Sequence, residues 1–338
     1  MTRALVTGVT GFVGSHLAEY LIANTDWNVI GMTRWRSPLD NIESLVPLIN
    51  EGRRMRLVYA DLRDDIAVRN AVDDADADYV FHLAAQSYPQ TSFSSPLDTI
   101  DTNTNGTVRL LEAVRQHRKH QGVEREKPIV HVCSSSEVYG RSEKVPIDES
   151  APFHPASPYA VSKVGADLMA RHYAEAYGMN VQVTRMFTHT GARRGDVFME
   201  ATFAKQIAMI EAGMIPPVVK VGNLKSLRTV ADVRDAARAY HLVVTVDPQP
   251  GAVYNIGGSY TCTVGEILDK LMEMAGCRYA VEEDPARMRP VDADRQVPNC
   301  GKFKAHTGWE PEIPFERTMA DLLAFWRERV KRGAVLQR

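Results

Sequence analysis

The chain has 338 residues, of which 44% are hydrophobic and 24% charged, and its formal net charge is −2. This composition is ordinary for a globular protein, and the length fits one large domain or two joined domains of about 100–200 residues each. The absence of a basic run argues against nucleic-acid binding, and no apolar run approaches the ~18–20 residues of a membrane helix.

The four cysteines show no C-x-x-C spacing, which argues against a zinc site, and we expect no metal. Four scattered thiols suit a reducing compartment. The segment 1–8 enters a strand at once and does not have the pattern of a signal peptide. We therefore expect a cytoplasmic protein.

Apolar strands alternate with amphipathic helices through the first half of the chain. Continuous apolar runs indicate strands that are covered on both faces of a parallel sheet. The expected strands are 4–7, 28–32, 56–60, 79–83, 129–133 and 181–187, and the expected helices are 14–23, 66–72, 101–117 and 158–177. This alternation predicts an α/β fold with a doubly wound parallel sheet of the Rossmann type.

After Phe187 turn residues become frequent, and the segment 252–256 is the one strand expected to return to the sheet. Thr263 and Glu266 form a capping box that starts a helix ending near 274, and a last helix is expected over 315–329. We predict a cofactor domain of 1–187 plus about 229–258. The remaining segments, about 188–228 and 259–338, form a smaller substrate-binding lobe, and ligands bind in the cleft between the two.

A glycine-rich loop follows the first strand and opens the first helix. Gly8 permits the tight turn, Gly11 lets a pyrophosphate approach the backbone, and Gly14 lets the helix pack closely on the strand. The free N–H groups at the helix start, near Phe12 and Val13, attract phosphate. The strand–turn–helix context makes this a strong dinucleotide-binding signal.

The end of the second strand selects the form of the dinucleotide. A carboxylate there would bind the ribose hydroxyls of NAD, but Arg34 and Arg36 occupy the region. Guanidinium groups bind phosphate in two-point contacts, so the cofactor expected is NADP, with NAD the less favoured alternative. Asp61 and Leu62, after the third strand, are placed to touch the adenine.

Two segments carry the predicted chemistry. Ser157 and Pro158 start a helix cleanly, so Tyr159 is aimed rigidly and Lys163 lies one turn further on the same face. A nearby cation is expected to lower the pKa of the phenol, and Tyr159 then takes the proton of a substrate hydroxyl as hydride leaves for a nicotinamide. Ser135 can meet this face.

Glu137 is the unusual member of this group because plain alcohol oxidation needs no carboxylate. Oxidising a sugar at C4 makes the hydrogen at C5 acidic. A carboxylate can remove that proton, the C6 hydroxyl can leave as water, and the hydride can return to C6. The alternative is that Glu137 is a solvated loop acid.

Whole-chain similarity adds to this interpretation. The chain resembles the extended short-chain dehydrogenase/reductase family in its nucleotide-sugar branch, on the strength of segments 7–14, 82–87, 134–140 and 157–163. Within that branch it is most similar to GDP-mannose 4,6-dehydratases and GDP-4-keto-6-deoxy-mannose reductases. The resemblance implies catalytic roles for Ser135, Glu137, Tyr159 and Lys163. It implies cofactor contacts from Leu83, Ala84 and Ala85, and substrate contacts from Ser87, Ser136, Thr188, Arg194, Val221, Asn223, Arg228 and Arg289.

The chain departs from the family pattern at three positions. Thr188 replaces an Asn that usually faces substrate, Thr229 replaces an Asp, and Ser135 replaces the dehydratase Thr. The first two leave the sugar open between GDP-mannose and a GDP-manno-heptose. A GDP-4-keto-6-deoxy-sugar reductase, a C4 epimerase and a non-catalytic dinucleotide sensor remain alternatives. The segment 34–45 resembles a dehydratase segment that crosses to a neighbouring subunit, so a homodimer or homotetramer is expected.

Overall fold

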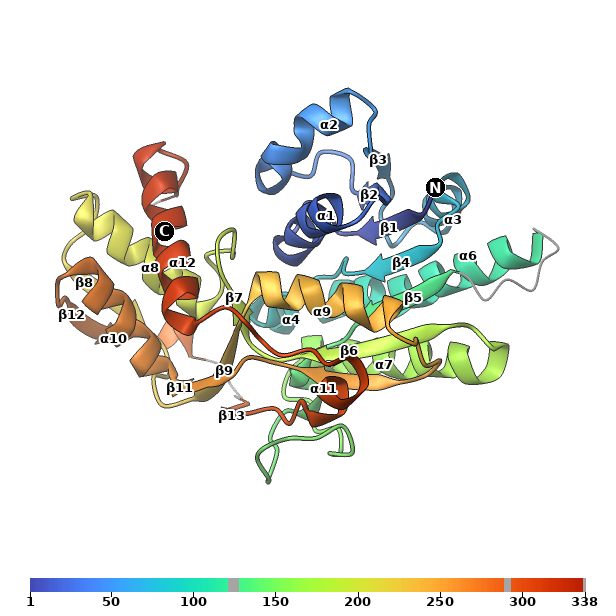
Figure 1. Ribbon diagram of the computed structural model, residues 1–338. Coiled ribbons are helices and arrows are strands. Elements are labelled where there is room, and N and C mark those ends of the chain that lie inside the picture. Colours follow the sequence, from blue (N-terminus) through green and yellow to red (C-terminus); the bar gives the residue numbers. More distant parts are fainter. Residues whose placement is uncertain (121–127, 289–292, 337–338) are drawn as a thin grey trace.

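A computed structural model describes residues 1–120, 128–288 and 293–336. Its centre is a parallel sheet in the order β10-β6-β5-β4-β1-β2-β3 (Figure 1). The strands are β1 (Arg3–Thr7), β2 (Asn28–Thr33), β3 (Met55–Tyr59), β4 (Tyr79–His82), β5 (Ile129–Cys133), β6 (Val181–Met186) and β10 (Val253–Ile256). The predicted doubly wound α/β fold is confirmed, including the late return of β10.

Helices cover both faces of this sheet. On one face α1 (Phe12–Asn24), α9 (Val233–Thr245) and α11 (Gly301–Thr307) pack against the strands. On the other face lie α3 (Asp65–Ala75), α6 (Gly106–His120) and α7 (Pro158–Tyr177). Apolar strand residues alternate between the two faces, so each face has its own core, as a parallel sheet buried on both sides requires.

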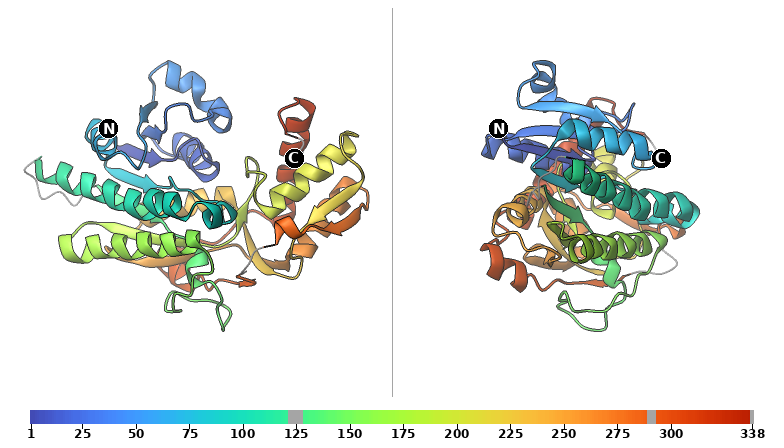
Figure 2. Two further views of the ribbon diagram at one scale, coloured as in Figure 1. Left: turned by 180° about the vertical axis from the view of Figure 1, so that it is seen from behind. Right: turned by 90° about the vertical axis from the view of Figure 1, so that its right-hand side faces the viewer.

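The smaller lobe has a third core of its own. It is built from α8 (Met199–Glu211), α10 (Val264–Ala275), α12 (Phe315–Lys331), β8 (Val218–Val221) and β12 (Ala280–Glu283). Figure 2 shows this lobe beside the carboxyl end of the main sheet. The capping box predicted at Thr263 and Glu266 is present at the start of α10. α8 and α9 were not expected from the pattern of turn residues.

A small second sheet joins the lobe to the larger domain. It contains β7 (His189–Thr190), β9 (Leu227–Asp232), β11 (Tyr260–Thr263) and β13 (Arg295–Gln296). Phe303 and Trp309 pack with α9 in a core of the larger domain, although the predicted lobe included them. We propose the same two-part division of the chain, with residues 301–309 moved to the larger domain.

Short helical segments complete the described chain and bring functional side chains toward the sheet. These are η1 (Asp40–Leu45), α2 (Val46–Asn50), α4 (Pro89–Ser94), α5 (Pro96–Ile100), the π-helical η2 (Asp101–Asn105), η3 (Ser136–Tyr139) and η4 (Pro285–Arg287). Within η2, Asn103 Nδ2 donates to Ser162 Oγ at 2.9 Å, and Thr104 Oγ1 donates to the carbonyl oxygen of Ser162 at 2.9 Å. The π-helical turn therefore anchors α7 one residue from Lys163.

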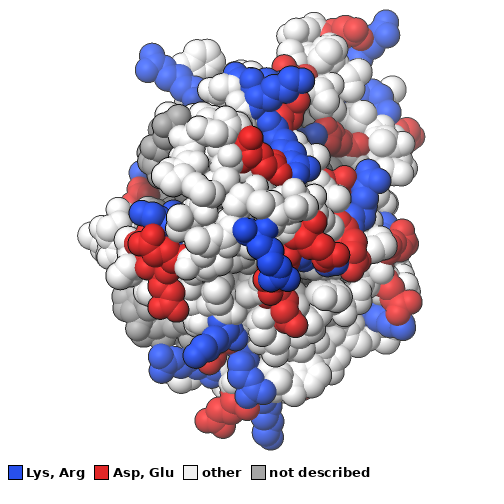
Figure 3. Space-filling model, turned by 90° about the vertical axis from the view of Figure 1, so that its left-hand side faces the viewer, with Lys and Arg blue, Asp and Glu red and all other residues white. Residues whose placement is uncertain are grey.

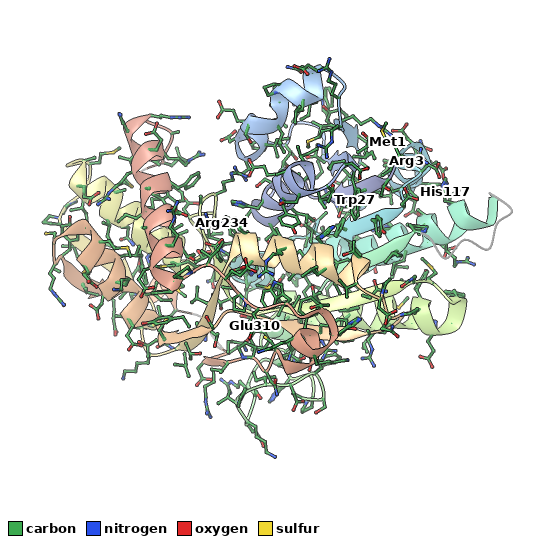
Figure 4. All side chains as sticks on the ribbon, in the orientation of Figure 1. Met1, Arg3, Trp27, His117, Arg234 and Glu310 are labelled. Carbon is green, nitrogen blue, oxygen red and sulfur yellow. The ribbon has the colours of Figure 1, made fainter. Side chains whose placement is uncertain are left out.

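The two ends of the parallel sheet differ in character. At the amino ends of the strands Trp27, labelled in Figure 4, stacks on Tyr79 with ring centroids 4.3 Å apart. The carboxyl ends face the lobe.

Positive and negative side chains are interspersed over the face drawn in Figure 3. None of the described helices has the length and apolar character needed to cross a membrane.

Candidate active site

A cavity of about 820 Å³ lies at the carboxyl ends of the central strands, between the sheet and the lobe. It extends from the glycine loop through the Ser-rich end of β5 to η4. The predicted site residues that line it are Gly8, Gly11, Phe12, Val13, Gly14, Arg34, Asp61, Leu62, Leu83, Ala84, Ala85, Ser87, Ser135, Ser136, Glu137, Tyr159, Lys163, Thr188, Arg194, Asn223 and Arg228. The fold therefore gathers residues far apart in sequence around one space.

Two of the predicted residues that the structure describes, Arg36 and Val221, are not among the lining residues of this cavity. Arg36 lines a neighbouring hollow of about 470 Å³, which it shares with Arg34. The side chain of Val221 is fully buried in the core of the lobe, and its predicted substrate contact stays a prediction. Arg289 lies outside the described residues. Arg287, two residues earlier, does line the cavity, and the sequence analysis did not single it out.

The glycine loop has the backbone that a pyrophosphate site requires. Gly8 has a φ of +72°, a conformation that residues with a Cβ rarely adopt. A Cβ on Gly14 would lie 2.2 Å from the carbonyl oxygen of Gly8, so only glycine allows this packing of helix on loop. Gly11 caps α1 without a side chain, which leaves the first N–H groups of the helix open to the cavity.

The adenine end is bordered by charged side chains. Arg34 is exposed and lines both the cavity and the adjoining hollow. Asp61 accepts hydrogen bonds from Arg63 Nε and Nη2 at 3.1 and 3.0 Å, and these bonds hold the pKa of its carboxyl below the usual range. Trp35 is 71% exposed and meets Tyr59 edge to face at 4.9 Å. This rim therefore combines cationic and aromatic groups.

The Tyr159 helix starts as predicted, because Ser157 Oγ accepts the Ala160 N–H at 3.1 Å and Pro158 occupies the first turn. Lys163 Nζ donates a 2.8 Å hydrogen bond to the carbonyl oxygen of Cys133, at the end of β5. That bond holds the ammonium group at the strand end. Tyr159 and Lys163 are 8% and 7% exposed.

The electrostatics of Tyr159 differ from the prediction. Burial raises the pKa of the phenol, and a hydrogen bond with Ser135 partly opposes that rise. Burial also lowers the pKa of Lys163, whose ammonium group donates to the Cys133 carbonyl oxygen. The pKa of Tyr159 is therefore raised, and the predicted lowering is wrong.

Glu137 is positioned by the turn that follows β5. Ser135 Oγ accepts the Glu137 N–H at 3.2 Å and caps the 3₁₀ turn η3. Glu137 is half-buried, lines the cavity, and contributes to the electrostatics of Tyr159. The turn thus places a hydroxyl, a carboxylate and a phenol around the same space.

The lobe end of the cavity carries positive charge. Arg228 on β9 is 9% exposed and its Nη1 donates to the carbonyl oxygen of Leu227 at 2.9 Å. Arg287 pairs with Asp284 at 3.3 Å, and Lys220 and Asn223 line the same end. Cations at this position favour an anionic ligand group.

Residues that the sequence analysis missed also line the cavity. They include Tyr88, His189, Phe198 and Glu200. Burial lowers the pKa of His189 to about 3, so its imidazole is neutral. The adjacent Phe187-Thr188-His189 and Arg193-Arg194-Gly195 segments could have signalled His189 and Phe198, whereas Glu200 gave no signal. Across the described parts of the chain, no group of three or more His, Cys, Asp or Glu side chains could hold a metal ion.

The chain was compared with known proteins. A family model described as GDP-mannose 4,6 dehydratase matches residues 5–322. The chain is 31% identical to a GDP-mannose 4,6-dehydratase of Yersinia enterocolitica over 100% of this chain and 97% of that protein. It is 32% identical to a GDP-6-deoxy-D-mannose reductase of Pseudomonas aeruginosa over 97% of this chain and 98% of that protein.

Solved structures have the same fold. A dTDP-glucose 4,6-dehydratase from Streptomyces venezuelae with NAD bound superposes with a TM-score of 0.85, at 27% identity and 98% coverage of both chains. RMD from Pseudomonas aeruginosa complexed with NADPH superposes at 0.80, with 29% identity over 97% of this chain and 100% of that one. The match of the family model over nearly the whole length, together with the geometry of the cavity, leads to one conclusion: the chain belongs to the GDP-mannose 4,6-dehydratase family.

Proposed function

We propose that this protein is an NADP-dependent GDP-sugar 4,6-dehydratase, a lyase that removes water from GDP-mannose or GDP-manno-heptose and leaves the 4-keto-6-deoxy sugar. The observation that carries the proposal is the position of Glu137. Its carboxylate lines the same cavity as Tyr159, Lys163 and Ser135. An elimination needs a base for a carbon-bound proton in addition to the proton-handling pair of an alcohol dehydrogenase.

The residues present fit a nicotinamide dinucleotide. The positive φ of Gly8 and the close contact at Gly14 make a cradle that a Cβ would fill, at the start of α1. Relatives of this fold bind such cofactors: RMD was solved with NADPH and the Streptomyces dehydratase with NAD. Arg34 and Arg36, on the rim of the cavity and its hollow, support NADP for this chain.

Each reactive side chain has a defined task. A bound nicotinamide would supply the hydride acceptor for C4 and the hydride donor for C6. Tyr159 accepts the proton of the C4 hydroxyl, and Ser135 holds that oxygen through the hydroxyl that also bonds the phenol. Lys163, which donates to the Cys133 carbonyl oxygen, would hold the cofactor ribose close to the strand end.

Elimination is the task of Glu137. Once C4 is a ketone, the C5 hydrogen is acidic, and the carboxylate takes that proton. The C6 hydroxyl then leaves as water. The proton that this step needs can come from the carboxyl group of Glu137, because that group has just taken the C5 proton. The product is completed by hydride at C6 and by a proton at C5, which balances the proton that Tyr159 took from the C4 hydroxyl, so the overall reaction is the loss of one water and is redox-neutral.

The lobe end supports a nucleoside diphosphate. Arg228, Arg287 and Lys220 line the cavity there and can neutralise the charge of two phosphates. The named relatives act on GDP-linked mannose derivatives by their descriptions, which supports guanosine for this chain. Ser87, Ser136, Thr188 and Asn223 are proposed as further substrate contacts since they line the same space.

A GDP-4-keto-6-deoxy-sugar reductase is the second candidate. The similarity to the Pseudomonas reductase, at 32% identity, favours it specifically. A reductase uses Tyr159 and Lys163, but its reaction does not require removal of the C5 proton. A C4 epimerase is a third and weaker choice.

One experiment separates these reactions. The purified protein with NADP is incubated with GDP-mannose or GDP-manno-heptose, without added reductant, and the products are analysed by mass spectrometry. A dehydratase produces a sugar nucleotide that has lost one water. Unchanged substrates, together with oxidation of NADPH by a GDP-4-keto-6-deoxy sugar, would establish the reductase instead.

Assembly into a homodimer or homotetramer is also proposed. Val161 and Leu168 on α7 are 49% and 47% exposed, and Leu97 on the neighbouring α5 is 82% exposed. Exposed apolar groups on adjacent helices favour contact with a second copy. Ile42 and Leu45 pack in the core of their own subunit, which leaves the rest of segment 34–45 to reach a neighbour. Light scattering measures the mass in solution.

We also propose that the protein is located in the cytoplasm, because its four cysteines are free thiols, which suit a reducing compartment.

A further inference from the structure

Tyr139 is the last residue of the η3 turn that carries Glu137. The two residues are two positions apart in this turn of four residues. Glu137 lines the cavity, whereas the side chain of Tyr139 is fully buried and packs in a small apolar cluster with Val138 and Ile147. The turn therefore presents one side chain to the cavity and buries another in the interior.

The hydroxyl group of Tyr139 has a partner on each of two neighbouring strands. It donates to Asn255 Oδ1 at 2.7 Å and accepts from Arg185 Nη1 at 2.9 Å. Asn255 on β10 and Arg185 on β6 are directly paired in the central sheet. Burial raises the pKa of Tyr139 to about 12, so the hydroxyl keeps its proton at neutral pH and remains a donor. The hydroxyl thus fastens the turn to the sheet.

Both partners of the hydroxyl are themselves held by hydrogen bonds. Asn255 Nδ2 donates to the carbonyl oxygen of Ile147 at 2.9 Å, and the Asn255 N–H donates to Glu149 Oε1 at 2.7 Å. Arg185 Nη1 also donates to the carbonyl oxygen of Glu149 at 3.1 Å. Buried groups bonded in this way keep their positions, because any movement leaves a polar group unpaired.

The backbone of the turn is fixed close to Glu137. Ser135 Oγ accepts the Glu137 N–H, and the carbonyl oxygen of Val138 accepts the His154 N–H at 3.0 Å. Gly140, which follows the turn, has a φ of +50°, and a Cβ there would lie 1.7 Å from the carbonyl oxygen of His154. The turn is thus held through its backbone on one side and through Tyr139 on the other.

The position of the Glu137 carboxylate matters most for the step in which it removes a proton from carbon. A reacting group that is misplaced by about 1 Å can lose about 100-fold in rate. The oxidation at C4 uses Tyr159 and Lys163, which lie on α7 and are anchored separately by η2. A shift of η3 at its Tyr139 end therefore slows the elimination selectively.

We propose that Tyr139 is a positioning residue, whose hydroxyl, held by Arg185 and Asn255, aims the carboxylate of Glu137 at the C5 hydrogen. Tyr139 acts through Glu137 and takes no part in hydride transfer. This inference rests on the proposed function for the identity of the reaction.

The test compares the two chemical steps in Tyr139→Phe, which keeps the ring and removes the hydroxyl. The full-length protein with NADP is mixed with the GDP-sugar that the wild type dehydrates. Absorbance of the reduced nicotinamide follows C4 oxidation, and rapid quenching with mass spectrometry follows water loss. We expect water loss to slow about 10- to 100-fold and oxidation to stay within about twofold, so that reduced nicotinamide accumulates. Partial unfolding would instead lower both steps in the same proportion.

Two further measurements separate positioning from a general structural role. With the substrate deuterated at C5, the isotope effect on water loss should be larger in Tyr139→Phe than in the wild type, because removal of the C5 proton becomes slower. Asn255→Ala removes the acceptor instead of the donor and should give the same difference between the two steps. Equal slowing of both steps, or of neither, in Tyr139→Phe overturns the proposal.

A matched control lies next to Asn255 on β10. Tyr254 is also buried, and its hydroxyl lies 2.6 Å from His306 Nδ1, away from η3. Tyr254→Phe therefore loses a comparable hydrogen bond, and both steps should stay within about twofold of the wild-type rates. A selective loss of elimination in Tyr254→Phe would also overturn the proposal.

Crystal structures distinguish this proposal from the proposed function. In Tyr139→Phe the Glu137 carboxylate should lie about 1 Å from its wild-type position relative to Tyr159. An unchanged position overturns the positioning role, whatever the reaction. If the wild type removes water from neither GDP-sugar, the dehydratase function is wrong, and the displacement of Glu137 alone decides the role of Tyr139.

Discussion

Arg185 and Asp167 form a two-point ion pair inside the protein. Nε and Nη2 of Arg185 donate to Oδ2 and Oδ1 of Asp167 at 2.8 and 3.0 Å, and the side chains are 2% and 0% exposed. Asp167 lies on α7 one turn after Lys163, and Arg185 lies on β6. Arg185 Nη1 also donates to the Tyr139 hydroxyl at 2.9 Å. This pair fastens the helix that carries Tyr159 to the sheet.

Removing Asp167 should destabilise the whole protein. Asp167→Ala leaves a buried guanidinium without its counter-charge, and the free energy of unfolding should fall by about 3–5 kcal/mol. Urea denaturation followed by circular dichroism measures this change. Glu211→Ala, which breaks the surface pair with Arg327, should cost less than about 1 kcal/mol. Similar losses for the two variants would contradict the role given to the buried pair.

Glu137→Gln should separate oxidation from elimination. The amide keeps the shape of the side chain but cannot take the C5 proton. With GDP-mannose and NADP we expect reduced nicotinamide and the 4-keto sugar to accumulate, and water loss to slow by at least about 100-fold. Absorbance of the reduced cofactor and mass spectrometry follow the two steps. Dehydration at the wild-type rate would exclude Glu137 from the mechanism.

Tyr159→Phe should abolish the first step and preserve binding. The phenol lines the cavity with Ser135 and Lys163 and is the group proposed to take the proton of the C4 hydroxyl. We expect kcat to fall at least 1,000-fold, roughly the scale of losing a general base, while the affinity for GDP stays unchanged. Rapid-quench analysis and calorimetry provide the two measurements. A fall in GDP affinity would instead indicate a change in the structure of the cavity.

The buried His82 should make the protein acid-sensitive. Thr7 Oγ1 and Thr107 Oγ1 lie 3.0 Å from its two ring nitrogens, and burial lowers its pKa to about 3, from 6.5. Below pH 6.5 His82 becomes protonated in the unfolded chain, while in the folded chain it stays neutral. The stabilisation present above pH 6.5 is therefore lost progressively down to about pH 3.

At pH 5.5 the stabilisation lost through His82 is about 1.4 kcal/mol in the free energy of unfolding. Urea titrations at pH 7.5 and 5.5 should show a smaller acid-induced loss, by about that amount, in His82→Gln than in the wild type. His172→Gln, at an exposed position, should leave the loss unchanged. If His82→Gln and the wild type lose the same stability on acidification, His82 does not contribute to the acid sensitivity.

Arg34→Ala should weaken NADP selectively. Loss of a guanidinium contact to the additional phosphate should raise the Kd for NADP about 10- to 100-fold and leave that for NAD within about twofold. Fluorescence titration measures both constants. Arg53→Ala, at an exposed residue outside the lining of the cavity, is the control. Equal changes for both dinucleotides would argue that Arg34 touches the shared part of the cofactor.

The sequence by itself determined the features that depend on neighbouring residues in the chain. Alternating apolar strands and helices predicted the parallel sheet, and the spacing of Gly8, Gly11 and Gly14 predicted the phosphate loop. Ser157 and Thr263 predicted two helix starts that the structure has. These signals are local because capping, turn conformation and helical periodicity each act within a few residues.

Tertiary structure alone decided the contacts between distant segments. The bond from Lys163 to the Cys133 carbonyl, the buried pair of Asp167 and Arg185, and the place of Glu200 in the cavity all join elements whose approach no local pattern encodes. The sequence also could not predict the direction of the Tyr159 pKa shift, because this shift depends on burial rather than on the spacing of Tyr159 and Lys163. The sequence identified the reactive residues, and packing between distant segments determined how far they are buried and which groups they bond.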